Sequence, residues 1–382
     1  MVSSPPPSSS ATLCAPVSTY RVGRVTEILQ PGEHLAGQSA HYLPAEPQNV
    51  LWGRLPCRRD TPVLRVSPGE SVTVDTLSHE GLLEDQGRDP LRYFAGLGVD
   101  PEHVLSDAIT LAASDAPRDA RTDGPHVNTG PIHVAGAQPG DLLKVTIGSL
   151  QRRVPYGIIS NRHGKGALPE FPRREHDVSI FAGVDEGRGT IAPFAGAERS
   201  ITFELNPFFG TIGVAVDDDA RPHSVPPGTH GGNIDIRMLT EGASLYLPVQ
   251  VPGALVFLGD PHFAQGDGEV ALTAMEASLR GTVQFDVIAR EDALRQFGEQ
   301  VGPIAETTEY LIPTGMNEDL DLAVESCVRN AVALLQARWG LDPEHAYAYL
   351  SAATDFHISQ VVDIVKGVHA AVRKSDFRSL AS

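Results

Sequence analysis

Short runs of β-branched and other apolar residues, separated by proline and glycine turn signals, restrict the possible folds of this chain more than any other feature. PVLRV, SPGE and SVTVDTL follow one another, and GPIHV, AGAQPGD and LLKVTIGSL repeat the pattern further along. The central section continues with ITFELNPFFGTIGVAVDD, SLYLPVQVPGALVFLGD and LRGTVQFDVIA. Such punctuated runs are typical of β-hairpins. The sequence therefore predicts a mainly β fold.

Helical periodicity appears only after Pro313, in NEDLDLAVESCVRNAVALLQARWG. Asn317 is the predicted N-cap of this helix, and Gly340 follows its end. The predicted apolar stripe consists of Leu320, Val324, Val328, Ala331 and Leu335. A second helix is predicted to begin at Asp342-Pro343, an N-cap followed by proline. HISQVVDIVKGVHAAVR is expected to return as a strand.

The chain divides into four predicted parts. Residues 1–17 form a Pro/Ser tail that is expected to be disordered, because it cannot bury enough apolar surface to offset its ordering entropy. Residues 18–150 are predicted to be β-rich with an inserted excursion at about 80–125, which we expect to lie over a site. Residues 151–312 are a central β-rich part with the site motifs, and 313–382 carry the C-terminal helices and closing strand, packed on the same body.

Charge and cysteine content argue against several classes of function. Lys and Arg number 30 against 48 Asp and Glu, a formal net charge of -18, so nucleic acid is not an expected partner. Three isolated cysteines support neither a disulfide framework nor a zinc–thiolate site, and they favour a reducing cytoplasm. The N-terminus lacks the features of a signal peptide, and no apolar run reaches the roughly 18 residues of a membrane span. A soluble cytoplasmic protein without a membrane partner is expected.

Ionisable residues concentrate beside a predicted core strand in LVFLGDPHFAQGDGE. Asp260 and His262 are two residues apart, as are Asp267 and Glu269, and a strand places such pairs on one face. The intervening glycines permit tight turns that can fold both pairs towards one point. Carboxylates that only satisfy turn amides are the alternative, but burying several together is costly without a cation or a proton. Histidine with carboxylates suits zinc, manganese or iron.

Three further segments offer polar side chains. In PPGTHGGNIDIR, His230 precedes two glycines, and Asn233 and Asp235 alternate onto one predicted strand face; a glycine-rich turn with exposed polar residues is the alternative. In TLSHEGLLEDQGRDP, His79 ends a strand-like run that leads into a charged loop. SNRHGKGALPEF holds Lys165 among three basic residues, a rarity in an acidic chain. Serine and cysteine nucleophile motifs are missing, so a metal-activated water is the remaining hydrolytic route.

The stretch HGGNIDIRMLTEGASLYLPVQVPGALVFLGDPHFAQGDGEVALTAMEASLRGTVQFDV closely resembles the acetamidase/formamidase family. That family has an HGGN-x-D segment, a LYLPV-x-V-x-GAL strand and a GD-x-H-x-x-x-GDGE loop in this order. NTGPIHVAGAQPGDLLKVTI, PVLRVSPGESVTVDT and YLSAATDFHISQVVD resemble other family segments, so the likeness begins near residue 20. It implies a metal-containing, usually oligomeric amidohydrolase on a mainly β fold with jelly-roll-like and β-sandwich elements and a few helices.

The family motif matches seven polar positions of this chain: His230, Asn233, Asp235, Asp260, His262, Asp267 and Glu269. Among these positions we expect Asp260, His262 and one of His230 or Asp235 to be the ligands of a divalent metal, with zinc as the first candidate. Glu269 is the expected general base. Asp267 is expected only to shape its turn.

The substrate is expected to be a small amide held by several neighbouring groups. His79 is expected to position the amide, and Asn233 and Lys165 to bind it. The N–H groups of Gly231 and Gly232 are candidates for stabilising the oxyanion.

Departures from the family pattern bear on the substrate. Ala135 and Gln138 stand where the family commonly has acidic residues, and the 80–125 excursion is an addition. A lactamase for cyclic amides is therefore as credible as a formamidase or acetamidase.

The rival functions are a metal-dependent β-fold oxygenase or isomerase, and a ligand-binding β-sandwich with structural calcium. His262 argues against calcium, which prefers oxygen ligands. Glu276 is predicted to be structural. A homo-oligomer is expected because the exposed edges of β-sheets carry unpaired backbone groups that a second subunit can cover.

Overall fold

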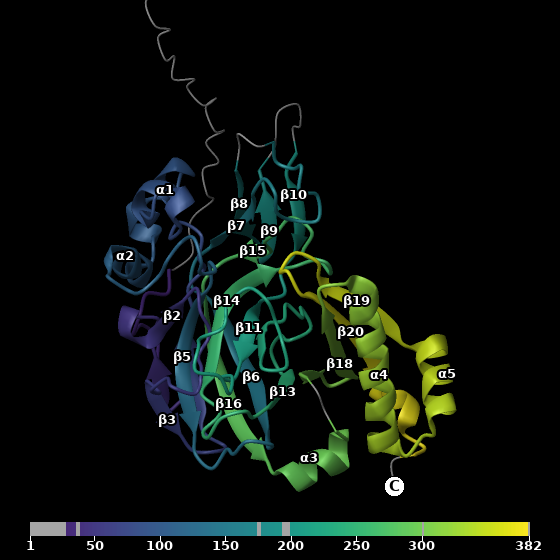
Figure 1. The fold of residues 1–382 in the computed structure, drawn as a ribbon. Coiled ribbons are helices and arrows are strands. Elements are labelled where there is room, and N and C mark those ends of the chain that lie inside the picture. Colours follow the sequence, from purple (N-terminus) through teal and green to yellow (C-terminus); the bar gives the residue numbers. More distant parts are fainter. Residues whose placement is uncertain (1–27, 36–38, 174–176, 193–198, 300–301, 381–382) are drawn as a thin grey trace, which may run out of the picture.

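A computed structural model describes residues 28–35, 39–173, 177–192, 199–299 and 302–380 of the chain (Figure 1). Within these residues the strands form two large sheets, which confirms the predicted mainly β fold. The nine-stranded sheet has the order β1 (His41–Leu43), β4 (Ser71–Asp75), β16 (Leu279–Ile288), β6 (Leu142–Arg152), β13 (Ser244–Pro248), β17 (Ile304–Glu306), β18 (Tyr310–Asn317), β20 (Lys366–Arg373) and β19 (Asp355–Gln360).

The second sheet has eleven strands in the described part of the chain and carries most of the polar residues singled out in the sequence. Its order is β10 (Ile201–Glu204), β9 (Arg188–Ile191), β8 (Val178–Asp185), β7 (Tyr156–Asn161), β15 (Met275–Glu276), β14 (Val256–Ala264), β11 (Phe208–Gly213) and β12 (Gly231–Asn233). β5 (Val127–Val134) pairs with β14, and with β2 (Val50–Trp52) and β3 (Leu64–Val66). Most neighbouring strands are antiparallel, as the hairpin-like sequence predicts.

The predicted C-terminal helices are confirmed as α4 (Leu320–Trp339), the longest helix of the described residues, and α5 (Pro343–Ala353). Asp342 is the N-cap of α5, as predicted. The prediction for the start of α4 is wrong: β18 continues through Asn317, and Asp319 caps the helix by accepting two backbone N–H groups of the first turn. The other helical elements are α1 (Pro90–Gly96), α2 (Ser106–Ala113), α3 (Arg290–Phe297) and the 3-10 turns η1 (Pro47–Asn49), η2 (Glu84–Gln86), η3 (Pro101–His103) and η4 (Lys374–Phe377).

The buried face of α4 differs from the predicted stripe. Its buried residues are Ala323, Cys327, Ala331, Leu334 and Leu335, whereas Val324 is 37% exposed. The reason is a close approach of α4 to β18, because a Cβ atom on Gly315 would lie 2.2 Å from the Cys327 nitrogen and 2.3 Å from the Ala323 carbonyl oxygen. Small side chains must face the strand there, and a pattern of bulky apolar residues does not reveal such a face.

The closing segment forms two strands rather than the predicted one. β19 and β20 are an antiparallel pair, and residues 361–365 connect them. The end of β19 contacts the loop that follows β14: the Gly268 N–H donates to the Ser359 carbonyl at 3.1 Å, and the Val361 N–H donates to the Gly268 carbonyl at 3.1 Å. The C-terminal hairpin is therefore attached to a loop about 90 residues upstream.

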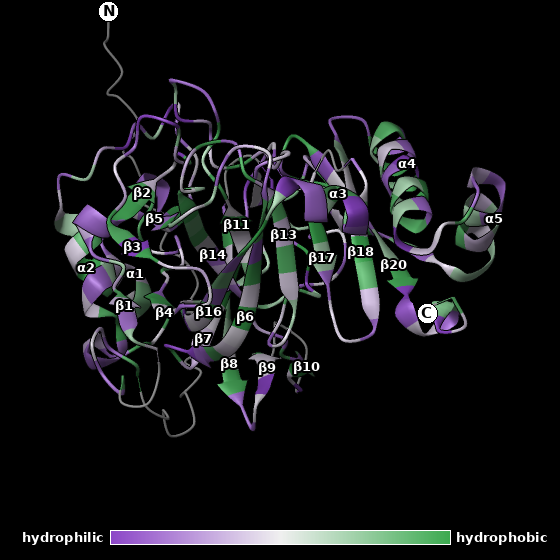
Figure 2. Cartoon of the chain, turned by 90° about the horizontal axis from the view of Figure 1, so that it is seen from below, coloured by the Kyte–Doolittle hydropathy of each residue, from purple (hydrophilic) through white to green (hydrophobic). Residues whose placement is uncertain are grey.

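Strands of both sheets contribute to one cluster of buried apolar side chains. Val145 and Phe285 come from the nine-stranded sheet, and Ile212 and Leu258 from the eleven-stranded sheet. Figure 2 shows hydrophobic residues in green along β13 and β18, whereas α3 is largely hydrophilic. No helix of the described residues is long and apolar enough to cross a bilayer. The predicted tail, 1–17, lies outside the described residues, and the three further parts of the chain stay predictions.

Replacing Gly315 by alanine tests the contact between α4 and β18. We expect Gly315→Ala to lower the free energy of unfolding by about 1–3 kcal/mol, because the added methyl group must push the helix backbone away. Gly96→Ala is the matched control, since a Cβ atom on Gly96 meets nothing within 4 Å. Urea unfolding of both variants and the parent chain measures the difference. Equal stabilities for the two variants would contradict the packing described for α4.

Candidate functional site

Asp260 and His262 lie side by side on one face of β14, as their spacing predicts. The Asp260 Oδ2 atom is 3.2 Å from the His262 Nε2 atom, and both side chains are buried. The neighbouring strand β11 leaves room for them, because a Cβ atom on Gly210 would lie 2.7 Å from the His262 ring and 2.8 Å from Asp260 Oδ2. The same Cβ atom would lie 2.5 Å from Asp235 Oδ1. Because Gly210 has no side chain, the side chains of Asp235, Asp260 and His262 can all approach the same point of β11.

Asp235 approaches Gly210 from the segment after β12. The N–H groups of Ile234 and Asp235 both donate to the Gly210 carbonyl, at 3.1 and 3.2 Å. Glu269 arrives from the loop after β14, so the turn predicted between the two pairs of ionisable residues does fold back to the site. Asp235, His262 and Glu269 offer ligand atoms that all lie within 4.8 Å of one another.

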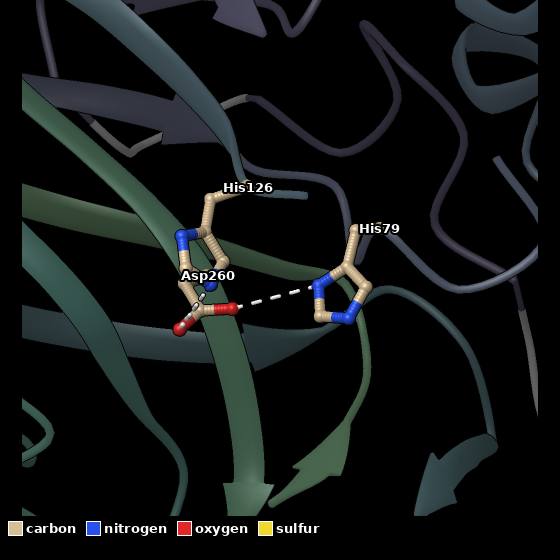
Figure 3. A group of neighbouring side chains, drawn as sticks. All are labelled: His79, His126 and Asp260. Atoms are coloured by element: carbon tan, nitrogen blue, oxygen red, sulfur yellow. Dashed lines mark ion pairs between the residues drawn. The ribbon is translucent and has the colours of Figure 1, made fainter. Parts of the chain in front are cut away.

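Two histidines flank Asp260 in Figure 3. The His79 Nδ1 atom lies 3.7 Å from Asp260 Oδ1, and the His126 Nε2 atom lies 3.8 Å from Asp260 Oδ2. His79 was predicted at the site, and the structure places it there. His126 was missed, because a histidine directly before a β-strand has no local signal that distinguishes it from a core residue.

Glu276 was predicted to be structural, yet it belongs to this cluster. β14 and β15 pair in a register that sets His262 opposite Glu276, and His262 Nε2 is 3.0 Å from Glu276 Oε1. Asp363 was also missed; it is buried and enters from the connection between β19 and β20. Both positions depend on contacts between strands or segments far apart in the sequence. The one available signal for Asp363 was its place at the end of YLSAATDFHISQVVD, a segment that resembles the acetamidase/formamidase family.

His230 is not brought to the cluster. In the β11–β12 pair, Asn233 lies opposite Thr211, near Asp260, whereas Gly231 lies opposite Gly213 at the far end of the strand. His230 precedes Gly231 and therefore lies away from the site. It belongs to no group of His, Cys, Asp or Glu ligand atoms within 4.8 Å among the described residues, and burial lowers its pKa to about 4. Of the two alternative ligands, Asp235 lies in the cluster and His230 does not.

The predicted oxyanion role of Gly231 is contradicted, because its N–H donates to the Gly228 carbonyl at 2.9 Å. Gly232 is buried in β12, opposite Ile212. Asn233 does line the cavity above the cluster, and its Oδ1 atom accepts a hydrogen bond from Thr211 Oγ1 at 2.8 Å. The Asn233 amide group therefore keeps its N–H donors for a bound molecule.

Asp267 points away from the cluster. Its Oδ1 atom accepts a hydrogen bond from Arg237 Nε at 2.8 Å, and its Oδ2 atom lies 2.9 Å from His357 Nδ1. The prediction that Asp267 only shapes the turn agrees with this placement, since Arg237 and His357 hold the loop from outside.

Burial raises the pKa values of four carboxyl groups at the site. The pKa of Asp235 is raised well above its usual 3.8, first by burial and then by the charge on Glu269. Burial and the charge on Asp363 raise the pKa of Glu269. The pKa of Asp363 rises to about 8, chiefly through burial, and burial raises that of Glu276. Such shifts are expected where buried carboxylates lie close to one another.

Several buried atoms of the cluster have no hydrogen-bond partner among the described residues: both carboxylate oxygens of Asp235, Asp260 Oδ1, Glu276 Oε2, Asp363 Oδ2 and His262 Nδ1. Unsatisfied buried carboxylates are costly, and a bound cation removes that cost. Asp260, His262 and Glu276 form a second group of ligand atoms within 4.8 Å, and His79, His126 and Asp260 form a third. The second group shares His262 with the first and Asp260 with the third, so the three groups are continuous. The combined donor set fits a divalent ion with nitrogen and oxygen ligands.

A cavity of about 480 Å³ lies above the cluster. Its inner part is lined by His79, His126, Asn233, Asp260, Glu269, Thr273, Glu276 and Asp363. Residues of the 80–125 excursion, including Leu83 and Arg118, line its outer part, together with Lys165. The excursion thus covers the site, and Lys165 lies on the cavity wall.

Divalent cations are expected to stabilise the folded chain after chelation. An ion that binds the native state but not the unfolded state adds about 2.7 kcal/mol to the free energy of unfolding at a concentration of 100 times its Kd. The Tm should therefore rise when zinc or manganese is added. Asp235→Asn should abolish most of this rise. Asp217→Asn is the control, because Asp217 pairs with Arg58 at the surface and belongs to none of the groups of possible metal ligands among the described residues. An unchanged Tm with every cation would contradict a metal site here.

The pH dependence of stability should report the buried carboxyl groups of the metal-free chain. The pKa of Asp363 rises from 3.8 to about 8 on folding, so its contribution is present at low pH and is lost as pH rises through that window. We expect the chelated chain to become less stable between about pH 4 and pH 8, and Asp363→Asn to weaken this dependence. Urea unfolding at several pH values measures it. An equally steep pH dependence in Asp363→Asn would contradict the shift.

Comparisons with known proteins agree with this geometry. A sequence model described as "Acetamidase/Formamidase family" matches residues 211–373. A formamidase from Methylophilus methylotrophus is 27% identical over 310 residues, which cover 65% of this chain and 75% of that protein. An acetamidase from Mycolicibacterium smegmatis is 27% identical over 300 residues, which cover 60% of this chain and 73% of that protein.

Solved structures show the same likeness. The crystal structure of a predicted acetamidase/formamidase from Thermoanaerobacter tengcongensis superimposes with a TM-score of 0.69 and 25% identity. The match covers 93% of this chain and 99% of that one, so it includes both sheets and the segments that carry the cluster. The chain therefore resembles the acetamidase/formamidase family in sequence and in fold, and it is a hydrolase of carbon–nitrogen bonds other than peptide bonds.

Proposed function

We propose that this chain hydrolyses the C–N bond of a small linear or cyclic amide, of the kind of formamide, acetamide or a γ-lactam, with a water molecule activated by a divalent metal, zinc being the first candidate. The observation that carries the proposal is the set of buried, unpaired carboxylate and imidazole atoms at the inner end of the cavity. Serine and cysteine nucleophile motifs are missing from the sequence, which leaves water as the nucleophile.

Asp260, His262 and Asp235 would hold the metal, with Glu276 and the flanking histidine His126 as further donors. A bound divalent ion would supply Lewis-acid chemistry, lowering the pKa of water towards neutrality and polarising the amide carbonyl. The surrounding strands fix the donors, because Gly210 lets three of them converge.

Glu269 is the proposed general base. It lines the cavity and is almost fully buried, and burial together with the charge on Asp363 raises its pKa. A more basic carboxylate accepts a proton from water more readily and still releases it to the leaving nitrogen. Glu269 would therefore take the proton in the first step and return it to the amine in the second.

Three residues are proposed to position the amide. Asn233 lines the cavity and its side-chain oxygen accepts a bond from Thr211, so its N–H groups, in place of that of Gly231, are the proposed donors to the carbonyl oxygen. His79 lies between Asp260 and Glu80, with Nε2 3.6 Å from Glu80 Oε1, so carboxylates on both sides orient its ring at the cavity wall. Lys165 on the outer wall is available to the part of the substrate that does not react.

Replacing Glu269 by glutamine tests its proposed role. Glu269→Gln should lower kcat by about 10²–10⁴-fold, the usual range for a lost general base, while the metal content stays close to that of the parent chain. Ammonia release from formamide and acetamide under anaerobic conditions measures hydrolysis and separates it from oxygen chemistry. Asp267→Asn, two residues away and turned outward, is the matched control and should keep its activity. Full turnover in Glu269→Gln with normal metal content would refute the assignment.

A further inference from the structure

The cavity is much larger than formamide or acetamide. Its volume is about 480 Å³, whereas a water molecule occupies about 30 Å³ in the liquid, and formamide has a single carbon atom. Cavities of about 300–1,000 Å³ commonly hold ligands of drug size. A substrate of one or two carbons would leave most of this space to water.

The outer wall of the cavity combines apolar residues with ionised residues whose charges cancel. Its apolar residues are Leu83, Ala120, Pro125, Val225, Leu272, Val362 and Ile364. Its ionised residues are three carboxylates and three cations: Glu84, Asp85, Asp123, Arg118, Arg162 and Lys165. Most of them are already paired within the protein, since Arg118 binds Glu84 and Arg162 Nε lies 2.5 Å from Asp85 Oδ2. Asp123 is held by Arg54 at 2.7 Å. Such a wall favours an uncharged group over an ionic one.

Two of these apolar residues are held in a backbone conformation that bulky residues avoid. Ile364 has φ 68° and Leu272 has φ 101°, both in the left-handed region. Ile364 is the central residue of a three-residue turn, because the Val365 N–H donates to the Asp363 carbonyl at 2.7 Å. Turns of this kind with a positive central φ are rare and strained, and a β-branched residue there is an outlier.

The strain at Ile364 is not offset by burial, because the side chain is 58% exposed. Strained residues of this kind cost about 1–3 kcal/mol each and concentrate at functional sites. The site shows this concentration, since Asp235, Asp260 and Glu269 also have positive φ values. Asparagine or glycine would fit the conformation of Ile364 at lower cost, so its large apolar side chain at the mouth points to a contact with a ligand.

We propose that the substrate is an uncharged amide whose acyl part is an apolar group of butanoyl length or longer, and that Leu272 and Ile364 select it by packing against that group. This inference rests on the proposed function and names the substrate class of the same site. The amide group would reach the buried cluster while the apolar part fills the outer cavity.

Hydrolysis of formamide, acetamide, butanamide and hexanamide by the full chain tests the inference. We expect kcat/KM to rise along the series by about fourfold for each CH₂ group that becomes buried. A series in which formamide or acetamide has the highest kcat/KM would overturn the inference and leave the proposed function intact. If no amide were hydrolysed, the proposed function would fail, and the inference with it.

Two variants test the selecting residues. Asparagine tolerates a positive φ, so Ile364→Asn and Leu272→Asn remove the apolar side chain without adding backbone strain. Each should lower the ratio of kcat/KM for hexanamide to that for acetamide by about tenfold, because one to two buried CH₂ contacts are lost. Ile201→Asn removes another exposed isoleucine, on β10 and outside the cavity lining, and should leave the ratio unchanged. An unchanged ratio in both cavity variants would overturn the roles of Leu272 and Ile364.

Discussion

The burial of several carboxyl groups around one histidine is the constraint on which the site depends. Asp235, Asp260 and Glu276 lie beside His262 with little access to solvent, and several of their oxygens have no partner in the part of the chain that the structure describes. Isolated charges cannot remain there at low cost, so the cluster must hold protons or a cation. In the metal-free chain, Glu276 and Asp260 raise the pKa of His262 well above its usual 6.5 despite burial, and the imidazolium then supplies positive charge.

Backbone geometry provides the room for that burial. Gly210 has no side chain at the point where β11 passes under Asp235, Asp260 and His262. β15 adds Glu276 through its register with β14, and the C-terminal hairpin adds Asp363. The cluster is thus assembled from segments that are distant in sequence but adjacent in the eleven-stranded sheet or attached to its edge. The family likeness over nearly the whole chain agrees with an arrangement that no single segment could make.

The sequence predicted the features that depend on local pattern. A spacing of two placed Asp260 and His262 on one strand face, and alternating runs with turn signals predicted the mainly β fold. His126 and Glu276 could not be predicted in this way, because their place at the site depends on strand pairing and register. His230 carried a strong motif, yet the direction of β12 takes it away from the cluster. The inner face of α4 was missed because it is made of small residues that allow a close helix–strand contact.

The attachment of β19 to the loop that carries Glu269 bears on how the chain reaches its active form. Gly268 exchanges backbone hydrogen bonds with Ser359 and Val361, and Asp363 follows directly after them. During synthesis the residues of the GDGE loop leave the ribosome well before these partners, and domains fold as their chain emerges. Until the hairpin has been synthesised, the loop lacks its backbone hydrogen bonds to Ser359 and Val361, and its carboxylates are exposed to water. Contacts of such sequence separation slow folding, so the loop that carries Glu269 should be among the last parts of the chain to become ordered.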